Sequence, residues 1–220
     1  MNTFYNEDKK TVQSFGDEWV KMNQKSLTEV EKIKIFNSLS ECINEKPDVG
    51  IITNESSFHV QTAILLANAG IDLFIEKPLS NSLKDCKELL KIIKKKKLIT
   101  QIGCQLRFHK CIKKIKEIIT TTKLGKIISV KVECGSYLPD WHPYEDYKKS
   151  YTANESLGGG VALTLVHELD MLNSLFGSLE LINSISGNFS NLDIKADDYL
   201  MANFKSQNRA INLHLSFAQV

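Results

Sequence analysis

Residues 75–80 read Ile-Glu-Lys-Pro-Leu-Ser, and this short stretch decides the fold. It closes the mostly apolar run 72–75, which has the length of a buried strand, and it precedes a helical pattern that begins near Ser82. The charged pair Glu76-Lys77 would then lie at the carboxyl end of a strand, where open α/β sheets bind their ligands. Pro78 fixes the backbone after the lysine and permits a cis peptide bond. On its own, the stretch is equally typical of a surface turn with incidental charges.

The flanking periodicities predict two sheets of different kinds. In the first part of the chain, apolar strands alternate with helices, which implies right-handed crossovers and a parallel sheet. These strands are expected at 49–53, 72–75 and 98–102, and these helices at 26–46, 56–69 and 82–96. After a helix at 110–121, consecutive strands imply a mixed or antiparallel sheet with a helix on one face. These elements are expected at 127–133, 159–176 (the helix), 179–188, 197–205 and 210–217, with a long loop at 135–156. The predicted fold class is α/β, a partial Rossmann-type parallel sheet followed by an α+β domain.

Four motifs follow one another along this pattern. They are the strand into Asn54–Ser57, the Glu-Lys-Pro element, the Arg107-Phe108 element, and Gly158–Gly160 before a helix that carries His167. In this order and at these spacings, the chain from about Ser38 onward resembles the Gfo/Idh/MocA family of nicotinamide-dependent sugar and cyclitol oxidoreductases. Its stretch 137–147 further resembles a branch of that family associated with surface-polysaccharide sugars.

The resemblance implies hydride transfer between NAD or NADP and a hydroxyl or keto group of a sugar, cyclitol or sugar nucleotide. Such a reaction needs a group that takes or gives the hydroxyl proton. In the family, the lysine of Glu-Lys-Pro polarises the oxygen and the histidine after the glycines is the acid/base, which implies catalytic roles for Lys77 and His167. The cofactor-binding residues implied are Thr53, Asn54, His59, Glu76, Lys77, Pro78 and Gln105. The substrate-binding residues implied are Arg107, Trp141, His142, Tyr147, Thr164 and Asp170.

Some positions have a second interpretation or depart from the family. Thr164 stands where many members carry an aspartate, and a hydroxyl cannot share a proton as a carboxylate does. His59 is also typical of an exposed histidine at a helix start, and the aromatic loop 137–151 is equally typical of an oligomer contact. His167 is followed by Glu168-Leu169-Asp170 without a second histidine at i+4, so no metal site is expected.

A phosphate-binding turn is missing from the expected first half of the nucleotide domain. No Gly-x-Gly-x-x-Gly sequence follows a strand anywhere in the chain. We therefore expect a divergent N-terminal extension over 1–37, a partial nucleotide-binding domain over 38–110, and a substrate and oligomerisation domain over 111–220 that ends early. An inactive fragment follows from this, and a non-catalytic binding or assembly protein is the alternative. A weaker alternative is a methyltransferase-related protein, from a faint resemblance at residues 13–36.

Composition limits the remaining classes of protein. The chain has 220 residues and a formal net charge of +2, which is too small to indicate a nucleic-acid partner. No apolar run approaches the roughly 20 residues of a membrane helix, and the N-terminus lacks a signal-peptide core. Five cysteines without C-x-x-C spacing suggest reduced thiols. We expect a cytoplasmic protein with a sugar-type substrate, neither a nucleic-acid nor a membrane partner, and a homo-oligomer through the C-terminal sheet.

Overall fold

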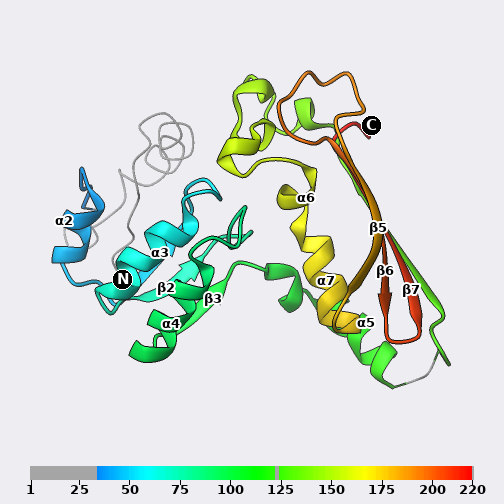
Figure 1. Cartoon of the computed structure of the whole chain (residues 1–220), viewed down its shortest axis with the longest axis horizontal. Helices are drawn as coiled ribbons and strands as arrows, with labels where there is room; N and C mark the ends of the chain where they lie inside the picture. Colours follow the sequence, from blue (N-terminus) through cyan, green and yellow to red (C-terminus); the bar gives the residue numbers. More distant parts are fainter. Residues whose placement is uncertain (1–33, 122–123, 220) are drawn as a thin grey trace. The chain divides into compact units, whose positions relative to one another are not determined.

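The computed structural model describes residues 34–121 and 124–219, which fall into two compact units. One unit ends at Gly103 and the other begins at Cys104 (Figure 1).

The first unit contains a parallel sheet with the strand order β1-β2-β3. The strands are β1 (Val49–Ile52), β2 (Asp72–Ile75) and β3 (Thr100–Ile102), and the helices are α2 (Leu39–Asn44), α3 (His59–Asn68) and α4 (Cys86–Lys96). Apolar strand residues pack with α3, because Gly50 leaves room for Leu66, whose Cδ1 would lie 2.7 Å from a Cβ atom at that position. The predicted parallel sheet with crossover helices is confirmed.

Side-chain caps move the helix starts away from the predicted positions. The helix expected at 26–46 is helical, in its described part, only over Leu39–Asn44, because Ser38 Oγ accepts from Glu41 N at 3.3 Å and starts the helix there. The helix expected from Ser82 begins at Cys86. Here Ser80 Oγ accepts from Ser82 N and Ser82 Oγ accepts from Lys84 N, and such local bonds compete with helix formation.

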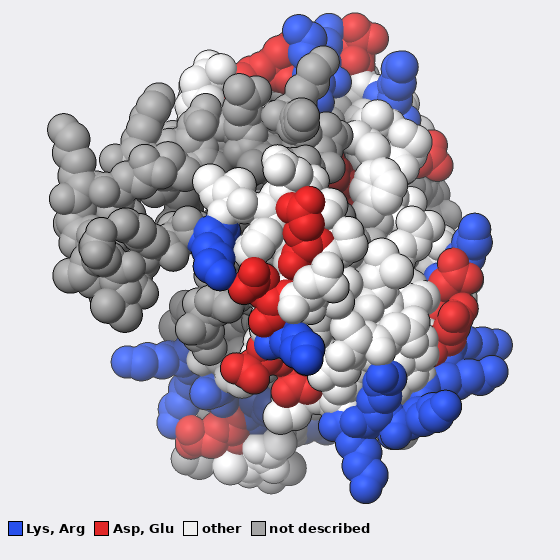
Figure 2. All heavy atoms as spheres, turned by 90° about the vertical axis from the view of Figure 1, so that its left-hand side faces the viewer, with Lys and Arg blue, Asp and Glu red and all other residues white. Residues whose placement is uncertain are grey.

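Figure 2 shows Lys and Arg side chains, coloured alike, on the lower part of one face of the molecule. Helix α4 contributes Lys94, Lys95 and Lys96 in its last turn, all of them exposed. Cations at a helix C-terminus complement the macrodipole, so these residues have a sufficient structural explanation. Lys97 then takes a left-handed conformation and ends the helix, which delays the third strand to Thr100 rather than Leu98.

The second unit contains a mixed sheet with the strand order β4-β7-β6-β5. The strands are β4 (Ser129–Gly135), β5 (Glu180–Gly187), β6 (Tyr199–Ser206) and β7 (Arg209–Ser216). Strand β4 pairs with β7 in parallel, and the other pairs are antiparallel. Alternate residues of β7, Ile211, Leu213 and Leu215, are buried with the helices, while Asn212 and His214 lie on the outer face. The predicted α+β unit is confirmed.

The helices of this unit are η2 (Gln105–Phe108), α5 (Lys110–Thr120), α6 (Val161–Thr164) and α7 (Val166–Phe176). The single helix predicted at 159–176 is therefore wrong in one respect, because Leu165, with ψ 33°, interrupts it. The break has a tertiary reason: α6 contacts β6 and β7, whereas α7 contacts η2 and α5. The long loop also contains the 3-10 turns η3 (Leu138–Asp140), η4 (Tyr147–Lys149), η5 (Tyr151–Ala153) and η6 (Glu155–Leu157). No helix in the described ranges has both the length and the apolarity to cross a membrane.

Candidate functional site

The carboxyl ends of the three parallel strands meet at one edge of the first sheet. Ile52 of β1 pairs with Ile75 of β2, which in turn pairs with Ile102 of β3. The ladder continues beyond the strands, because Glu76 N donates to Ile52 O at 2.9 Å and Gly103 N donates to Ile75 O at 2.8 Å. The turns after β1 and β2, which contain most of the predicted cofactor-binding residues, therefore lie at the edge where open α/β sheets bind ligands.

Glu76 holds the backbone of the predicted catalytic lysine. Its Oε2 accepts a hydrogen bond from Lys77 N at 2.6 Å. Its carboxylate also lies against Gly103, where a Cβ atom would come within 2.9 Å of Oε1. Lys77 is half-buried, and its peptide bond to Pro78 is cis. The acid of the Glu-Lys-Pro motif thus orients the peptide that carries the lysine, and the glycine after β3 leaves room for that acid.

His59 lies inside the first unit and is not an exposed residue at a helix start. It is the first residue of α3 and is 1% exposed. Its Nδ1 lies 2.7 Å from Pro78 O, and its Nε2 lies 2.7 Å from Asn54 O. In this arrangement both ring nitrogens are occupied by backbone carbonyls, so the ring links two turns and has no nitrogen left for the predicted cofactor contact.

Asn54 offers an acceptor at the same edge. Its Nδ2 donates to Thr62 Oγ1 at 3.3 Å. Its Oδ1 is buried and has no hydrogen-bond partner among the described residues. A buried acceptor without a partner is uncommon and calls for a specific explanation. Thr53 directly precedes Asn54 in the turn after β1.

In the second unit, the predicted acid/base lies beside the helix break. His167 is in the first turn of α7, and Thr164 is the last residue of α6. Thr164 is 6% exposed, so it belongs to the interior of the unit. Gln105 begins the η2 turn, and Arg107 lies within it. The predicted site residues are therefore divided between the two units.

Arg107 and Asp170, both predicted to bind substrate, bind each other. Arg107 Nε donates to Asp170 Oδ2 at 2.8 Å, and Nη2 donates to Oδ1 at 2.5 Å. The hydrogen bond to Asp170 raises the pKa of Arg107 above its ordinary value. Bidentate pairs of this kind combine charge with fixed geometry. This pair ties the η2 turn to α7, one turn beyond His167.

The aromatic side chains of the long loop are largely used to fix the loop itself. Trp141 Nε1 donates to Ser136 Oγ at 2.5 Å, and its ring packs edge-on against Phe217 at 5.4 Å. Tyr147 OH donates to Leu192 O at 2.9 Å. His142 Nδ1 lies 3.0 Å from Tyr144 OH in the exposed part of the loop. Of the aromatic residues predicted to bind sugar, Trp141 and Tyr147 therefore already have structural partners.

Sequence reasoning missed Asp197, which explains the last of the three consecutive glycines. Gly160 has φ +103°, and a Cβ atom there would overlap Asp197 Oδ1. Gly159 would likewise overlap backbone oxygens of Tyr151 and Thr152. Asp197 O accepts from Val161 N at 2.9 Å, at the start of α6. Burial raises the pKa of the Asp197 carboxyl, although hydrogen bonds from Ser186 and backbone N–H groups oppose the rise. The glycine-rich sequence signals this close approach without naming its partner.

A second pair that sequence reasoning missed joins β4 to α7. Burial, together with the charge and hydrogen bond of Glu168, raises the pKa of the Cys134 thiol to about 11. Glu168 is the residue after His167, and its Oε2 is buried without a hydrogen-bond partner among the described residues. Across the described part of the chain, no group of three or more His, Cys, Asp or Glu residues could hold a metal ion.

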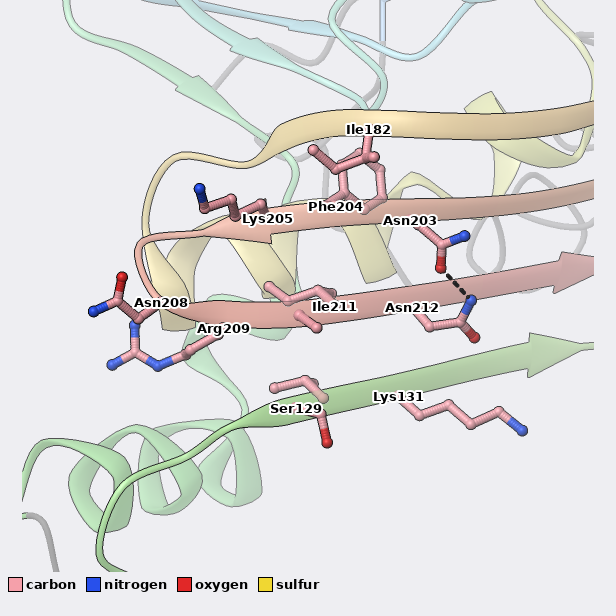
Figure 3. Close-up of a pocket in the computed structure, with 12 residues that line it drawn as sticks. Ser129, Lys131, Ile182, Asn203, Phe204, Lys205, Asn208, Arg209, Ile211 and Asn212 are labelled. Atoms are coloured by element: carbon pink, nitrogen blue, oxygen red, sulfur yellow. Dashed lines mark hydrogen bonds between the residues drawn. The ribbon is translucent and has the colours of Figure 1, made fainter.

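An open groove of about 760 Å³ lies on the sheet of the second unit. Figure 3 shows Lys205, Asn208 and Arg209 at the hairpin end of the groove, with Asn203 and Asn212 hydrogen-bonded farther along the strands. A further bond from Asn203 Nδ2 to Asn183 Oδ1 at 2.8 Å extends this row to β5. The lining residues are Ser129, Val130, Lys131, Ile182, Asn203, Phe204, Lys205, Asn208, Arg209, Ala210, Ile211 and Asn212.

Two family models match the chain and together span most of it. Residues 4–104 match an oxidoreductase family with an NAD-binding Rossmann fold, and residues 112–219 match the GFO/IDH/MocA C-terminal domain. The first match includes residues 13–36, so the methyltransferase interpretation has no support. It also includes most of the predicted extension 1–37, whose first 33 residues lie outside the described structure.

Curated proteins and solved structures give the same relationship. The chain is 27% identical over 147 residues to levoglucosan dehydrogenase of Pseudarthrobacter phenanthrenivorans, covering 65% of this chain and 37% of that protein. It is 28% identical over 144 residues to inositol 2-dehydrogenase of Salmonella typhimurium, covering 64% of this chain and 39% of that protein. The fold matches the WlbA dehydrogenase of Bordetella pertussis, solved with NADH and UDP-GlcNAcA, with a TM-score of 0.77 and 22% identity, covering 85% of this chain and 54% of that one. The chain thus spans about half the length of these relatives, or less.

Proposed function

Because the chain belongs to the Gfo/Idh/MocA family of oxidoreductases, we propose that its residues serve hydride transfer between NAD or NADP and a sugar-type hydroxyl or keto group. In this proposal Lys77 polarises the substrate oxygen and His167 exchanges its proton. The observation that carries it is the setting of Lys77. The lysine follows β2 at the ligand-binding edge of the sheet, and Glu76 holds its backbone N–H at 2.6 Å.

The carboxyl edge of the first sheet suits the nicotinamide end of the cofactor. Asn54 Oδ1 is a buried acceptor without a partner in the described residues, and the carboxamide N–H of nicotinamide is a donor of the kind it lacks. Gln105, Thr53 and Glu76 complete the proposed contacts. The chain has no Gly-x-Gly-x-x-Gly sequence for the pyrophosphate, so we expect this end to contribute most of the binding.

Calorimetric titration of the 220-residue chain with NAD, NADP and nicotinamide mononucleotide tests the cofactor assignment. Because the chain lacks the glycine-rich turn for the pyrophosphate, we expect the dinucleotides to bind no more than a few-fold more tightly than the mononucleotide. Asn54→Ala is the diagnostic variant, because it removes the acceptor Oδ1 and should weaken binding of the dinucleotides and of the mononucleotide alike. The matched control is Asn191→Ala in the second unit, which should leave binding unchanged. Micromolar binding of NAD or NADP, with weak binding of the mononucleotide, would contradict the expectation and reveal a phosphate site.

The catalytic roles are tested in a full-length relative, at the positions that match Lys77 and His167. Each alanine substitution should lower kcat by about 10²–10⁴-fold, as removal of a positioned acid/base does. Cofactor affinity should change much less. Turnover within a few-fold of the parent would count against the assigned roles. Substrates of the sugar, cyclitol and sugar-nucleotide classes, including those of surface polysaccharides, are the ones to compare.

A non-catalytic assembly role is the second proposal, and the outer face of the C-terminal sheet favours it. Strand β5 is exposed along its length apart from Gly187, and Ile185 is 57% exposed beside Met201. We propose that a second copy of the chain covers this face. Light scattering after size exclusion should give a dimer or larger for the parent and a monomer for Ile185→Arg. A monomeric parent would reject this proposal.

All five cysteines are free thiols, which agrees with a reducing cytoplasm as the location of the protein.

A further inference from the structure

The two contacts of His59 have an unusual chemical requirement. Pro78 O and Asn54 O are both backbone carbonyls, at 2.7 Å from Nδ1 and Nε2 respectively. A carbonyl oxygen only accepts hydrogen bonds, whereas a neutral imidazole has one donor nitrogen and one acceptor nitrogen. Both contacts are therefore hydrogen bonds only when both ring nitrogens carry a proton. With a neutral ring, one contact would place two lone pairs against each other.

The two carbonyls belong to turns that follow neighbouring strands. Asn54 lies in the turn after β1, and Pro78 lies in the turn after β2. The two strands are paired, with Ile52 opposite Ile75. Lys77 lies between two anchors in this arrangement. On one side Glu76 Oε2 accepts its backbone N–H at 2.6 Å, and on the other side the carbonyl of Pro78 is bound to the ring of His59.

We propose that His59 is a positioning residue that acts as the doubly protonated imidazolium, joins the turns after β1 and β2, and thereby holds the backbone of Lys77. The proposal rests on the proposed function of Lys77, but its chemistry concerns His59 alone. It makes His59 a structural cation, in place of the cofactor ligand that the family resemblance implies.

The charged and dipolar groups near His59 affect how stable a cation is at this position. A cation at the first position of α3 opposes the helix macrodipole, and α3 has no acidic residue in its first turn. A buried charge therefore needs hydrogen bonds to acceptors, which the two carbonyls provide. The titratable groups of the two turns are Glu55, Glu76 and Lys77. Of these, Glu55 is a carboxyl only 6% exposed in the same turn as Asn54.

Ring-nitrogen NMR of the full chain, labelled with ¹⁵N in histidine, tests the proposal without any ligand. At pH 7 we expect two protonated nitrogens for His59, with N–H protons protected from water because the ring is buried. Exposed His109 is the internal reference, because its Nδ1 accepts from Cys111 N and so lacks a proton. The spectrum of His59→Gln assigns the signals. One unprotonated nitrogen on His59 would overturn the proposal.

Hydrogen exchange of the Lys77 amide tests the positioning role. His59→Gln keeps one donor and loses the other, so exchange of the Lys77 N–H should become about five- to tenfold faster, the equivalent of one hydrogen bond. Amides of β6 should not change, and His109→Asn, which keeps the helix cap, should leave Lys77 unaffected. Unchanged exchange at Lys77 in a folded His59→Gln would reject the positioning role. If the variant does not fold, backbone-to-ring correlations in the parent assign the His59 nitrogens instead, and the spectrum of the parent still decides the proposal. Failure of the parent to bind NAD or NADP would reject the proposed function and leave both readouts intact.

Discussion

Arg107 donates two hydrogen bonds to the carboxylate of Asp170, although 63 residues separate them. The two side chains are 47% and 15% exposed, so solvent weakens the pair on one side only. Because Asp170 lies one turn after His167, the pair sets where the helix with the proposed acid/base lies against the η2 turn. Arg107 and Asp170, which the sequence predicted to contact substrate, therefore position helix α7.

A double-mutant cycle measures this pair. Arg107→Lys keeps the charge and loses the fork geometry, and Asp170→Asn removes the charge. We expect a coupling energy of about 0.5–1 kcal/mol in urea unfolding, because half of the guanidinium is in water. Lys114 and Glu117 form a fully surface pair and provide the control, with a smaller coupling. Strictly additive effects at 107 and 170 would show that the pair does not contribute.

Asp197 should make stability depend on pH in an unusual direction. Burial raises its folded-state pKa above the ordinary 3.8, so the folded state binds the proton more tightly than the unfolded state. Stability from this group is therefore present below pH 3.8 and is lost as pH rises through the raised value. Asp197→Asn keeps an acceptor and removes this loss. Its unfolding free energy relative to the parent should increase with pH over that window.

Asp193 is the control for that experiment, with the opposite sign. The hydrogen bond from Lys148 lowers the pKa of Asp193, so its stabilisation is present above pH 3.8 and is lost as pH falls through the lowered value. The unfolding free energy of Asp193→Asn should therefore fall relative to that of the parent as pH rises from acidic values. Parallel pH profiles for the parent and Asp197→Asn would contradict the assignment for Asp197.

Gly160→Ala should destabilise the chain more than a glycine substitution whose only cost is the positive φ angle. Gly70 has φ +85° with open space around it, so Gly70→Ala should cost about 1–2 kcal/mol of unfolding free energy. Gly160 adds the overlap with Asp197 Oδ1 to a φ of +103°, and its cost should exceed that of Gly70→Ala. Thermal and urea unfolding measure both variants. Equal losses would show that Asp197 moves aside at little cost.

Alkylation should separate the thiols by their surroundings. Cys111 is exposed, whereas burial and Glu168 raise the pKa of Cys134 to about 11. The thiolate is the reactive form, so iodoacetamide at pH 8 should label Cys111 well before Cys134. Glu168→Gln removes the nearby negative charge and should speed labelling of Cys134 while leaving Cys111 unchanged. Mass spectrometry of tryptic peptides gives both rates, and an unchanged Cys134 rate would argue against the Glu168 contact.

The sequence by itself determined the two sheets and the order of the motifs. Strand and helix periodicities reflect local backbone geometry, so the apolar runs that became β1 and β2 and the alternation along β7 were readable in one dimension. The Glu-Lys-Pro stretch placed Lys77 after a strand, and Gly158–Gly160 marked the entry to the helix that carries His167. Local caps such as Ser38 shifted boundaries by amounts that periodicity does not encode.

Only the tertiary structure decided which polar groups meet. Arg107 finds Asp170, Gly160 makes room for Asp197, and the ring of His59 joins Asn54 to Pro78, all across loops whose paths depend on packing. Hydrogen bonds depend on distances of a few tenths of an ångström between segments far apart in the chain. The spacing of residues does not contain those distances, so the sequence predicted which side chains carry chemistry, and packing decided whether they bind a ligand or each other.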